Sequence, residues 1–247
     1  MFDVAVIGAG PAGCLAAKTA AQRGLKVALV ERRKKLSPIT RACCQQLVMD
    51  PGYAGDTVSA LPGGIFFERG GFGVPYAGPL FEVRRKYYIS PAGRRICFDH
   101  GDGRPLAVQF DKGRLLEDLW RSCGRAGVEL MPGVTAWDAA DDGDFVRVQL
   151  ASGSRRFEIQ ARKILVADGV NSRMAAALGM NRGRQHFVTT QVLVYLLEGV
   201  ANPEPQAIQS FYGNVYQTRA PIILYPYFDD AGRARLCMPA NKDKLPG

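Results

Sequence analysis

A short glycine-rich block near the N-terminus constrains the fold more than any other part of the chain. Gly8-Ala9-Gly10-Pro11-Ala12-Gly13 directly follows the apolar run Val4–Ile7, which is typical of a buried parallel strand. In a dinucleotide-binding βαβ unit, the first glycine permits a tight turn from strand to helix. The second lets the backbone approach a pyrophosphate, and the third lets the helix pack closely on the strand. The pyrophosphate then rests on the N–H groups at the start of the helix.

A carboxylate in the right place strengthens this interpretation. Glu31 ends a second apolar run, Val27–Val30, where a carboxylate can accept hydrogen bonds from ribose hydroxyls. Residues 2–7 and 26–31 are predicted strands, and 11–23 is a predicted helix that stops at Gly24. A glycine-rich turn without a ligand would explain the glycines but not the acid in register. The sequence therefore predicts an α/β fold with a Rossmann-type, doubly wound parallel sheet.

The rest of the chain alternates between helical and strand-like patterns. Residues 113–126 and 172–178 predict helices, and the dense glycine, proline and aromatic residues of 37–95 favour a folded, turn-rich insertion over a linker. Residues 163–167 predict a buried strand that leads into Asp168-Gly169. The other predicted strands are 64–68, 80–83, 128–131, a hairpin of 145–150 with 157–160, and a β-rich region of 187–197, 207–212, 221–228 and 234–239.

Composition places the chain among globular proteins without a membrane-spanning helix. Its 247 residues are 47% hydrophobic and 22% charged, and no apolar run approaches the roughly 18–20 residues that span a bilayer. The start does not resemble a signal peptide, so we expect a cytoplasmic protein. The six cysteines show no metal-ligand spacing, and we expect reduced thiols, with Cys43-Cys44 buried and inert.

The net charge of +9 is concentrated in clusters of lysine and arginine. Such a field suits anionic ligands such as dinucleotides, or peripheral contact with an anionic membrane surface. Nucleic acid is disfavoured, because the usual binding signatures are absent and the clusters are expected in turns between strands. These clusters are Arg32-Arg33-Lys34-Lys35, Arg84-Arg85-Lys86, Arg94-Arg95 and Arg155-Arg156.

The order of these motifs resembles the FAD-dependent oxidoreductases with the para-hydroxybenzoate-hydroxylase-type fold, most closely the geranylgeranyl reductase-like group. The resemblance rests on Phe2–Gly13, Glu31-Arg32 and Ala167–Arg173, and on the spacing between them. It implies FAD at the N-terminal site, with Gly8, Gly10, Pro11, Ala12, Gly13, Glu31 and Arg32 around its adenosine and pyrophosphate. It also implies that Asp168 and Gly169 wrap the rest of the cofactor, and that NAD(P)H donates electrons.

Further positions carry over from the same resemblance. Arg41 lies where many members keep an arginine beside the cofactor, although a solvated loop arginine is the alternative. Lys112 replaces the arginine expected before the middle helix, so it offers a point charge and not a bidentate fork. The backbone near Ala136 corresponds to the region that meets the adenine. No catalytic side chain and no metal site is predicted, since flavin enzymes leave the difficult chemistry to the cofactor.

Two departures from the family pattern bear on the reaction. Cys43-Cys44-Gln45 stands where the reductases carry Cys-Gly-Glu, and the later Gly-Asp block of the family is missing before Gly247. A truncated reading frame and a natural short form both remain open. The resemblance divides the chain into an FAD-binding domain, residues 1–60 and 96–184, and a β-rich substrate-side domain, residues 61–95 and 185–247.

Three functions remain open at this point. The first is an oxidoreductase that passes reducing equivalents from NAD(P)H through the flavin to an apolar, isoprenoid- or lipid-like substrate. The second is an aromatic or polyketide monooxygenase, which shares the same motifs. The third is a non-catalytic dinucleotide-binding remnant. The sequence does not decide the oligomeric state.

Overall fold

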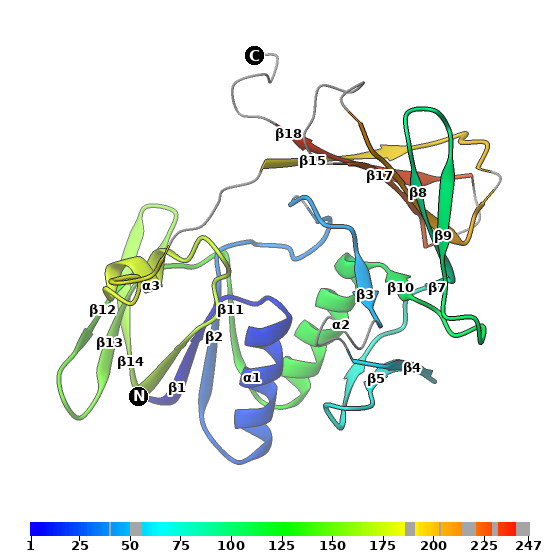
Figure 1. The fold of residues 1–247 in the computed structure, drawn as a ribbon. Coiled ribbons are helices and arrows are strands. Elements are labelled where there is room, and N and C mark those ends of the chain that lie inside the picture. Colours follow the sequence, from blue (N-terminus) through cyan, green and yellow to red (C-terminus); the bar gives the residue numbers. More distant parts are fainter. Residues whose placement is uncertain are drawn as a thin grey trace. The chain divides into compact units, whose positions relative to one another are not determined.

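The computed structural model divides the chain into two compact units (Figure 1). The first comprises Met1–Pro38 and Gly113–His186, and the second comprises Ile39–Lys112 and Phe187–Gly247. Residues 39–60 and 96–112, which the sequence assigned to the nucleotide-binding domain, are grouped with the second unit. The structure describes residues 1–39, 41–49, 56–185, 191–202, 204–213, 221–228 and 232–240.

A six-stranded sheet in the order β11-β2-β1-β14-β13-β12 forms the first unit. The four strands β11, β2, β1 and β14 are mutually parallel, while β13 and β12 continue the sheet in antiparallel fashion. The predicted βαβ unit and parallel sheet are therefore confirmed. The strands are β1 (Phe2–Ile7), β2 (Val27–Glu31), β11 (Glu129–Pro132), β12 (Thr135–Asp141), β13 (Val146–Ser152) and β14 (Arg155–Val166).

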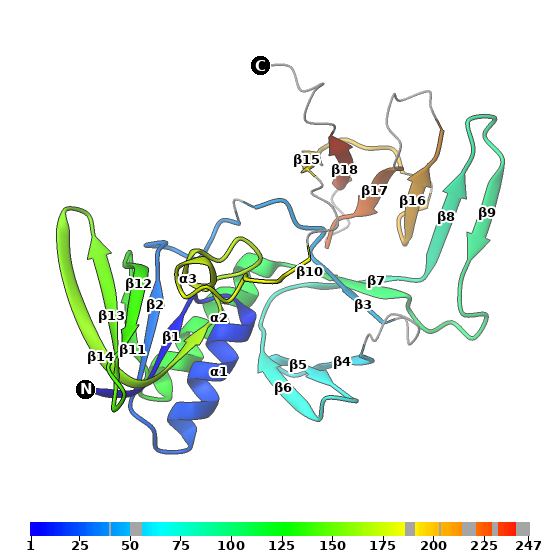
Figure 2. The ribbon, with the colours of Figure 1, turned by 60° about the vertical axis from the view of Figure 1, so that its left-hand side comes forward.

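Helices cover both faces of this sheet. Figures 1 and 2 show α1 (Pro11–Gln22) and α2 (Lys112–Arg125) together on one face, and the short helix α3 (Arg173–Ala177) on the other. The thiol of Cys123 in α2 donates to the carbonyl oxygen of Cys14 in α1 at 3.2 Å. The two helices therefore pack directly against each other, as the strip of small residues in α1 allows.

Successive side chains of a strand point to opposite faces of the sheet, so β1 contributes buried side chains to both faces. Ala5 and Ile7 join a buried cluster with Leu150 of β13 and Met174 of α3. Val6 alternates with them and is also fully buried, so it faces α1 and α2. The core on both faces fixes the register of β1, and with it the position of the glycine block that follows.

The structure corrects the prediction for residues 157–167. They do not form two strands, since a single strand, β14, runs from Arg155 to Val166. Its first half pairs with β13, and its second half pairs in parallel with β1. The second half was predicted to be buried, but Leu165 is 40% exposed.

Three sheets form the described part of the second unit. β15-β18-β17-β16-β8-β9 is the largest, and β3-β10-β7 and β4-β5-β6 have three strands each. Residues 58–98 thus form a folded insertion, as predicted, although β4, β6, β8 and β9 were not foreseen. The bounds are β3 (Gln46–Val48), β4 (Val58–Leu61), β5 (Gly64–Phe67), β6 (Phe72–Pro75), β7 (Leu80–Val83), β8 (Arg85–Ile89), β9 (Arg95–Phe98), β10 (Ala107–Phe110), β15 (Gln191–Leu197), β16 (Ala207–Phe211), β17 (Ile222–Pro226) and β18 (Ala234–Ala240).

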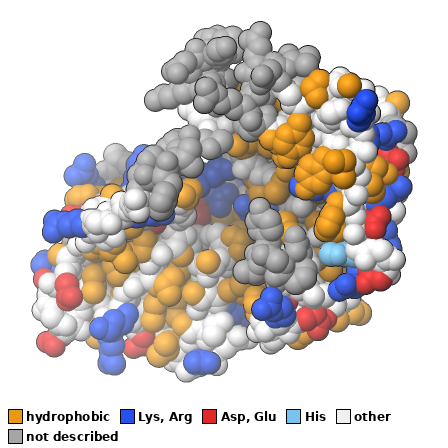
Figure 3. Space-filling model, viewed as in Figure 1, with side chains coloured by type: hydrophobic (Ala, Val, Ile, Leu, Met, Phe, Trp, Pro, Cys, Tyr) orange, Lys and Arg blue, Asp and Glu red, His pale blue; other side chains and the backbone are white. Residues whose placement is uncertain are grey.

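The basic clusters do not all lie in turns, which corrects another expectation. Arg85 and Lys86 belong to β8, and Arg155-Arg156 begins β14. Lys86 lies 4.8 Å from the ring centre of Tyr88, so part of this charge is placed over aromatic faces. Figure 3 shows hydrophobic and basic side chains intermixed on the visible surface. Among the helices that the structure describes, none is long and apolar enough to cross a membrane.

Candidate dinucleotide-binding site

The turn between β1 and α1 requires glycine at two positions. Gly8 has a φ of +102°, and its N–H donates to the carbonyl oxygen of Val30 at 2.8 Å. A Cβ on Gly8 would lie 2.5 Å from the carbonyl oxygen of Ala167, and a Cβ on Gly13 would lie 1.9 Å from that of Gly8. Both glycines therefore let backbone segments approach one another within the protein.

Gly10 is different, because the space beside it is open. Among the described residues, a Cβ on Gly10 would meet nothing within 4 Å, and the φ of −71° and ψ of 176° at Gly10 suit any residue. Gly10 is the N-cap of α1, no side chain caps that helix, and Pro11 fills the first turn without an N–H. The N–H groups of Ala12 and Gly13 belong to a first turn that has no preceding helical acceptors. This end of α1 is thus an accessible site of positive potential, as a pyrophosphate requires.

Glu31 holds the glycine loop from the neighbouring strand. It is 5% exposed; its Oε2 atom accepts from the backbone N–H of Ala9 at 2.9 Å, and Oε1 accepts from the backbone N–H and Nε of Arg33 at 2.9 and 3.0 Å. Burial acts to raise the pKa of this carboxyl. The hydrogen bonds from Arg33 and Ala9 outweigh burial, and the pKa lies below its ordinary value. Glu31 is therefore ionised at neutral pH.

Asp168 follows β14 and carries an unsatisfied oxygen. Its Oδ2 atom accepts from the backbone N–H groups of Arg173 and Met174, at 3.1 and 3.4 Å. Its Oδ1 atom is buried and has no hydrogen-bond partner among the described residues. Buried polar oxygens without partners are rare in proteins and call for an explanation. A ligand hydroxyl or N–H at this position would supply the missing donor.

Gly169 and Ser172 shape the segment after Asp168. Gly169 has a φ of +94°, a conformation that favours glycine. The hydroxyl of Ser172 accepts from the N–H of Ala175 at 2.8 Å and caps α3. The turn thus fixes the direction of the Asp168 carboxylate.

The sheet topology brings these groups together. β2, β1 and β14 are parallel neighbours, so Glu31, the glycine block and Asp168 stand at the carboxyl ends of three adjacent strands. Ligands of open α/β sheets bind outside this edge. The anion-accepting end of α1 and the unpaired oxygen of Asp168 together fit the pyrophosphate and hydroxyl groups of a dinucleotide such as FAD.

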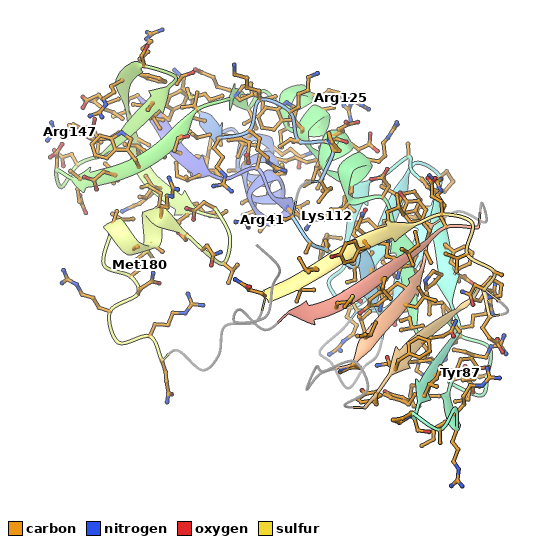
Figure 4. The ribbon with its side chains drawn as sticks, turned by 90° about the horizontal axis from the view of Figure 1, so that it is seen from above. Arg41, Tyr87, Lys112, Arg125, Arg147 and Met180 are labelled. Atoms are coloured by element: carbon orange, nitrogen blue, oxygen red, sulfur yellow. The ribbon has the colours of Figure 1, made fainter. Side chains whose placement is uncertain are left out.

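The remaining predicted residues lie elsewhere. Ala136 belongs to β12 and is buried in the hydrophobic cluster with Leu150 and Met174, so only its backbone is available to a ligand. Arg32 is exposed directly after Glu31. Arg41 is exposed in the segment before β3, and Lys112 begins α2; both belong to the second unit and are marked in Figure 4. Their contacts with a cofactor stay predictions.

Two features of the structure were not foreseen. The Ala9–Glu31 bond depends on strand adjacency, for which the acid after the second strand was the only signal. The expectation that Cys43 and Cys44 are buried is wrong, since both are half-buried, whereas Cys14 and Cys123 in the first unit are buried.

Each unit also contains a cavity. In the first unit, a cavity of about 220 Å³ adjoins the segment after Glu31 and has a largely basic lining. In the second unit, a cavity of about 440 Å³ has a mixed aromatic and polar lining. The first is lined by Arg33, Lys34, Lys35, Leu36, Ser37, Glu117, Trp120, Arg121 and Pro132, and the second by Phe81, Val200, Asn202, Pro205, Gln206, Pro226, Tyr227, Gly232 and Arg233.

Several similar proteins of known sequence are named digeranylgeranylglycerophospholipid reductase. A digeranylgeranylglycerophospholipid reductase of Methanosarcina acetivorans is 25% identical over 237 residues, which cover 92% of this chain and 52% of that protein. One from Methanosphaera stadtmanae is 26% identical over 247 residues, covering 97% of this chain and 57% of that protein. The chain thus spans about half the length of the curated relatives it matches.

Solved structures share the fold. A geranylgeranyl bacteriochlorophyll reductase-like protein from Thermoplasma acidophilum superimposes with a TM-score of 0.74 at 18% identity, covering 98% of this chain and 57% of that one. The p-nitrophenol 4-monooxygenase PnpA of Pseudomonas putida gives 0.66 at 14% identity, covering 98% of this chain and 58% of that one.

The model of one protein family, described as pyridine nucleotide-disulphide oxidoreductase, matches residues 2–197 and so covers most of the chain. The glycine turn, Glu31 and the parallel sheet all lie within the matched range. The chain therefore belongs to the pyridine nucleotide-disulphide oxidoreductase family and has the para-hydroxybenzoate-hydroxylase-type fold of FAD-dependent oxidoreductases.

Proposed function

We propose that this chain binds FAD and serves an oxidoreductase that passes reducing equivalents from NAD(P)H to an apolar, isoprenoid- or lipid-like substrate. The observation that carries the proposal is the set of groups at three adjacent strand ends. These are the open backbone at Gly10, the ionised Glu31 and the Oδ1 atom of Asp168, which has no hydrogen-bond partner in the part of the chain that the structure describes.

Each of these groups has a specific role in holding the cofactor. The N–H groups of Ala12 and Gly13 at the start of α1 receive the pyrophosphate, while Glu31 accepts from the adenosine ribose through lone pairs that Ala9 and Arg33 leave free. Asp168 accepts a hydrogen bond from the flavin half. FAD, when bound, supplies hydride-transfer chemistry, and the protein supplies position and shelter from water.

The residues taken from the family resemblance complete the proposal. Arg32 and Arg41 offset the negative charge of the cofactor, Lys112 adds a point charge, and the backbone at Ala136 meets the adenine. Nζ of Lys112 also donates a hydrogen bond to the Sγ atom of Cys43, so the cofactor would share this ammonium group with the cysteine.

The substrate class rests on the relatives. Proteins named digeranylgeranylglycerophospholipid reductases match nearly all of this chain at about a quarter identity. Their names specify a reduction of isoprenoid chains on a glycerophospholipid. This supports an apolar alkene substrate over a small polar one.

The visible spectrum of the purified chain tests the proposal. A yellow protein that bleaches on anaerobic addition of NADH or NADPH would support both cofactor and donor. A colourless protein that takes up no added FAD would overturn the proposal. If such a protein still bound ADP, the chain would be a non-catalytic dinucleotide-binding module.

A second candidate function is monooxygenation. The fold likeness to PnpA, at a TM-score of 0.66, favours it as an alternative. Reductase and monooxygenase differ in their use of oxygen. Oxygen consumption in a fixed ratio to product would establish the monooxygenase and exclude the simple reductase.

A further inference from the structure

The vicinal cysteines of the second unit lie in an unusual set of hydrogen bonds. The Sγ atom of Cys43 accepts from the backbone N–H of Gln45 at 3.4 Å and from Nζ of Lys112 at 3.7 Å. The thiol of Cys44 donates to the same sulfur. The sulfur is thus surrounded by donors, while Cys43 as a residue is half-buried and keeps part of its surface exposed.

The loop that carries Cys43 is held in place by Gln45. Gln45 has a φ of +51°, and it is the only residue other than glycine with a positive φ in the part of the chain that the structure describes. Its Oε1 atom accepts from the backbone N–H of Lys112 at 2.8 Å, and its carbonyl oxygen accepts from that of Phe110 at 3.0 Å. Such backbone strain persists only where surrounding contacts maintain it, and it concentrates at functional sites. The loop thus holds Cys43 beside the ammonium group of Lys112.

A buried arginine provides a second, independent feature. Arg235 is 3% exposed, and its Nη1 atom donates to the carbonyl oxygen of Cys44 at 3.0 Å and to Oε1 of Gln109 at 2.8 Å. Its Nη2 atom is buried and has no hydrogen-bond partner among the described residues. The guanidinium also lies over the rings of Tyr227 and Phe228, at 4.5 and 5.1 Å from their centres. A buried cation favours negative charge nearby, and both cysteines lie within its electrostatic range.

These surroundings shift the pKa values of Cys43 and Cys44 in opposite directions. The hydrogen bond from Cys44, opposed by burial and supported by Gln45 and Lys112, lowers the pKa of Cys43 to about 5. The pKa of Cys44 is raised, because it donates that hydrogen bond and is itself half-buried. At neutral pH the pair therefore consists of a thiolate and a neighbouring thiol, which is the arrangement of an attacking and a resolving cysteine.

We propose that Cys43 is a nucleophilic site that reacts with hydroperoxides, and that Cys44 resolves the product to a vicinal disulfide. The sulfur of Cys43 attacks the terminal peroxide oxygen, the O–O bond breaks, and Cys43 becomes a sulfenic acid while hydroxide leaves and is protonated to water. Cys44 then attacks the Cys43 sulfur and the S–O bond breaks. Hydroxide leaves with the Cys44 proton as a second water. Two thiols are oxidised by two electrons, and one hydrogen peroxide is reduced to two waters.

Peroxide treatment followed by peptide mass spectrometry tests both steps on the intact chain. One equivalent of hydrogen peroxide should remove two hydrogens from the peptide that contains Cys43 and Cys44, and a thiol reductant should restore them. In Cys44→Ser, the sulfenic acid should persist and be trapped by dimedone on Cys43. An unoxidised Cys43–Cys44 peptide, or a Cys44→Ser protein without the dimedone adduct, would overturn the proposal.

Alkylation by iodoacetamide tests the thiolate without oxidation. Between pH 8 and pH 6, the rate at Cys43 in the folded chain should change by less than about twofold, while in the unfolded chain it should fall by on the order of tenfold or more. Cys44→Ala, which removes the leading hydrogen bond to the Cys43 sulfur, should restore much of the pH dependence, and Lys112→Met should restore a smaller part of it that Lys112→Arg does not. Equal pH dependence in folded and unfolded chains would refute the site.

A control variant separates this site from general oxidation. Cys97 is exposed in β9, and Cys97→Ser should leave the oxidation of the Cys43–Cys44 peptide unchanged. The outcome does not depend on flavin, because all of these readings are taken on the peptide and need no activity of the loaded protein.

Discussion

The Oε2 atom of Glu31 accepts a 2.9 Å hydrogen bond from the backbone N–H of Ala9. The acid at the end of one strand thereby holds the glycine loop at the end of the next. A carboxylate commonly assigned to ligand binding therefore also has a structural role in the absence of ligand. This dual role leads to predictions that separate stability from cofactor binding.

Glu31→Gln should lower the free energy of unfolding by about 1.5–3 kcal/mol, because an amide NH₂ facing the N–H of Ala9 or the donors of Arg33 replaces a charged acceptor. Urea unfolding measures this change. Glu158→Gln is a matched control on β14, where the exposed carboxylate accepts from Gln149, and should alter stability by no more than about 0.5 kcal/mol. Equal effects of the two substitutions would contradict the role of Glu31.

The contribution of Glu31 should also depend on pH. Its pKa in the folded chain lies below the ordinary value of 4.5, so its stabilisation is fully present above pH 4.5 and is lost as the pH falls toward the folded pKa. The difference in unfolding free energy between wild type and Glu31→Gln should therefore be constant near neutrality and shrink below pH 4.5. A difference that grows on acidification would be incompatible with this assignment.

Two alanine substitutions in the glycine block should affect different properties: Gly13→Ala should lower stability, and Gly10→Ala should weaken FAD binding. Gly13→Ala places a Cβ 1.9 Å from the carbonyl oxygen of Gly8 and should cost about 3 kcal/mol of stability or more. Gly10→Ala places a Cβ that meets no atom of the described residues within 4 Å, and it should change stability by less than about 1 kcal/mol. If a pyrophosphate approaches Gly10, the same substitution should weaken FAD binding at least about tenfold, or about 1.4 kcal/mol. Flavin fluorescence titration measures this, and unchanged binding would place the pyrophosphate elsewhere.

Asp168→Asn addresses the unpaired oxygen. Asparagine keeps one carbonyl oxygen for the N–H groups of Arg173 and Met174, so stability should change by no more than about 1 kcal/mol. The Oδ1 atom becomes a donor, and FAD affinity should fall about tenfold or more. Asp138→Asn in β12 is the control, because the Asp138 carboxylate accepts only from the neighbouring backbone N–H of Ala139 among the bonds described, and FAD binding should not change. A normal affinity in Asp168→Asn would remove Asp168 from the site.

The parts of the fold that could be predicted are those with strong local patterns. β1, α1 and β2 were predicted to within a residue or two, because apolar runs and glycines mark both their interiors and their ends. β14 was divided in two because Arg162 interrupts its apolar pattern. Arg162 is exposed, and pairing with β13 and β1 sustains the strand through it.

The site could be predicted only in its sequence-local parts. Glycines and an acid at fixed spacing identify a dinucleotide motif. The environment of Cys43 could not be inferred in this way, because Lys112 and Arg235 reach it from distant parts of the chain. The same limit applies to the unpaired oxygen of Asp168, whose burial depends on how the chain packs around β14.

The parallel pairing of β1 with β14 has a consequence during synthesis on the ribosome. Ile7 pairs with Val166, and Gly8 packs against Ala167 and Asp168. The glycine turn emerges well before its closing partner, which is translated later by on the order of ten seconds at roughly 5–20 residues per second. Throughout that interval one edge of β1 has no partner strand, and such edges invite aggregation. The nascent chain therefore needs β2 and α1 to shield β1, or a chaperone to cover it, until β14 arrives.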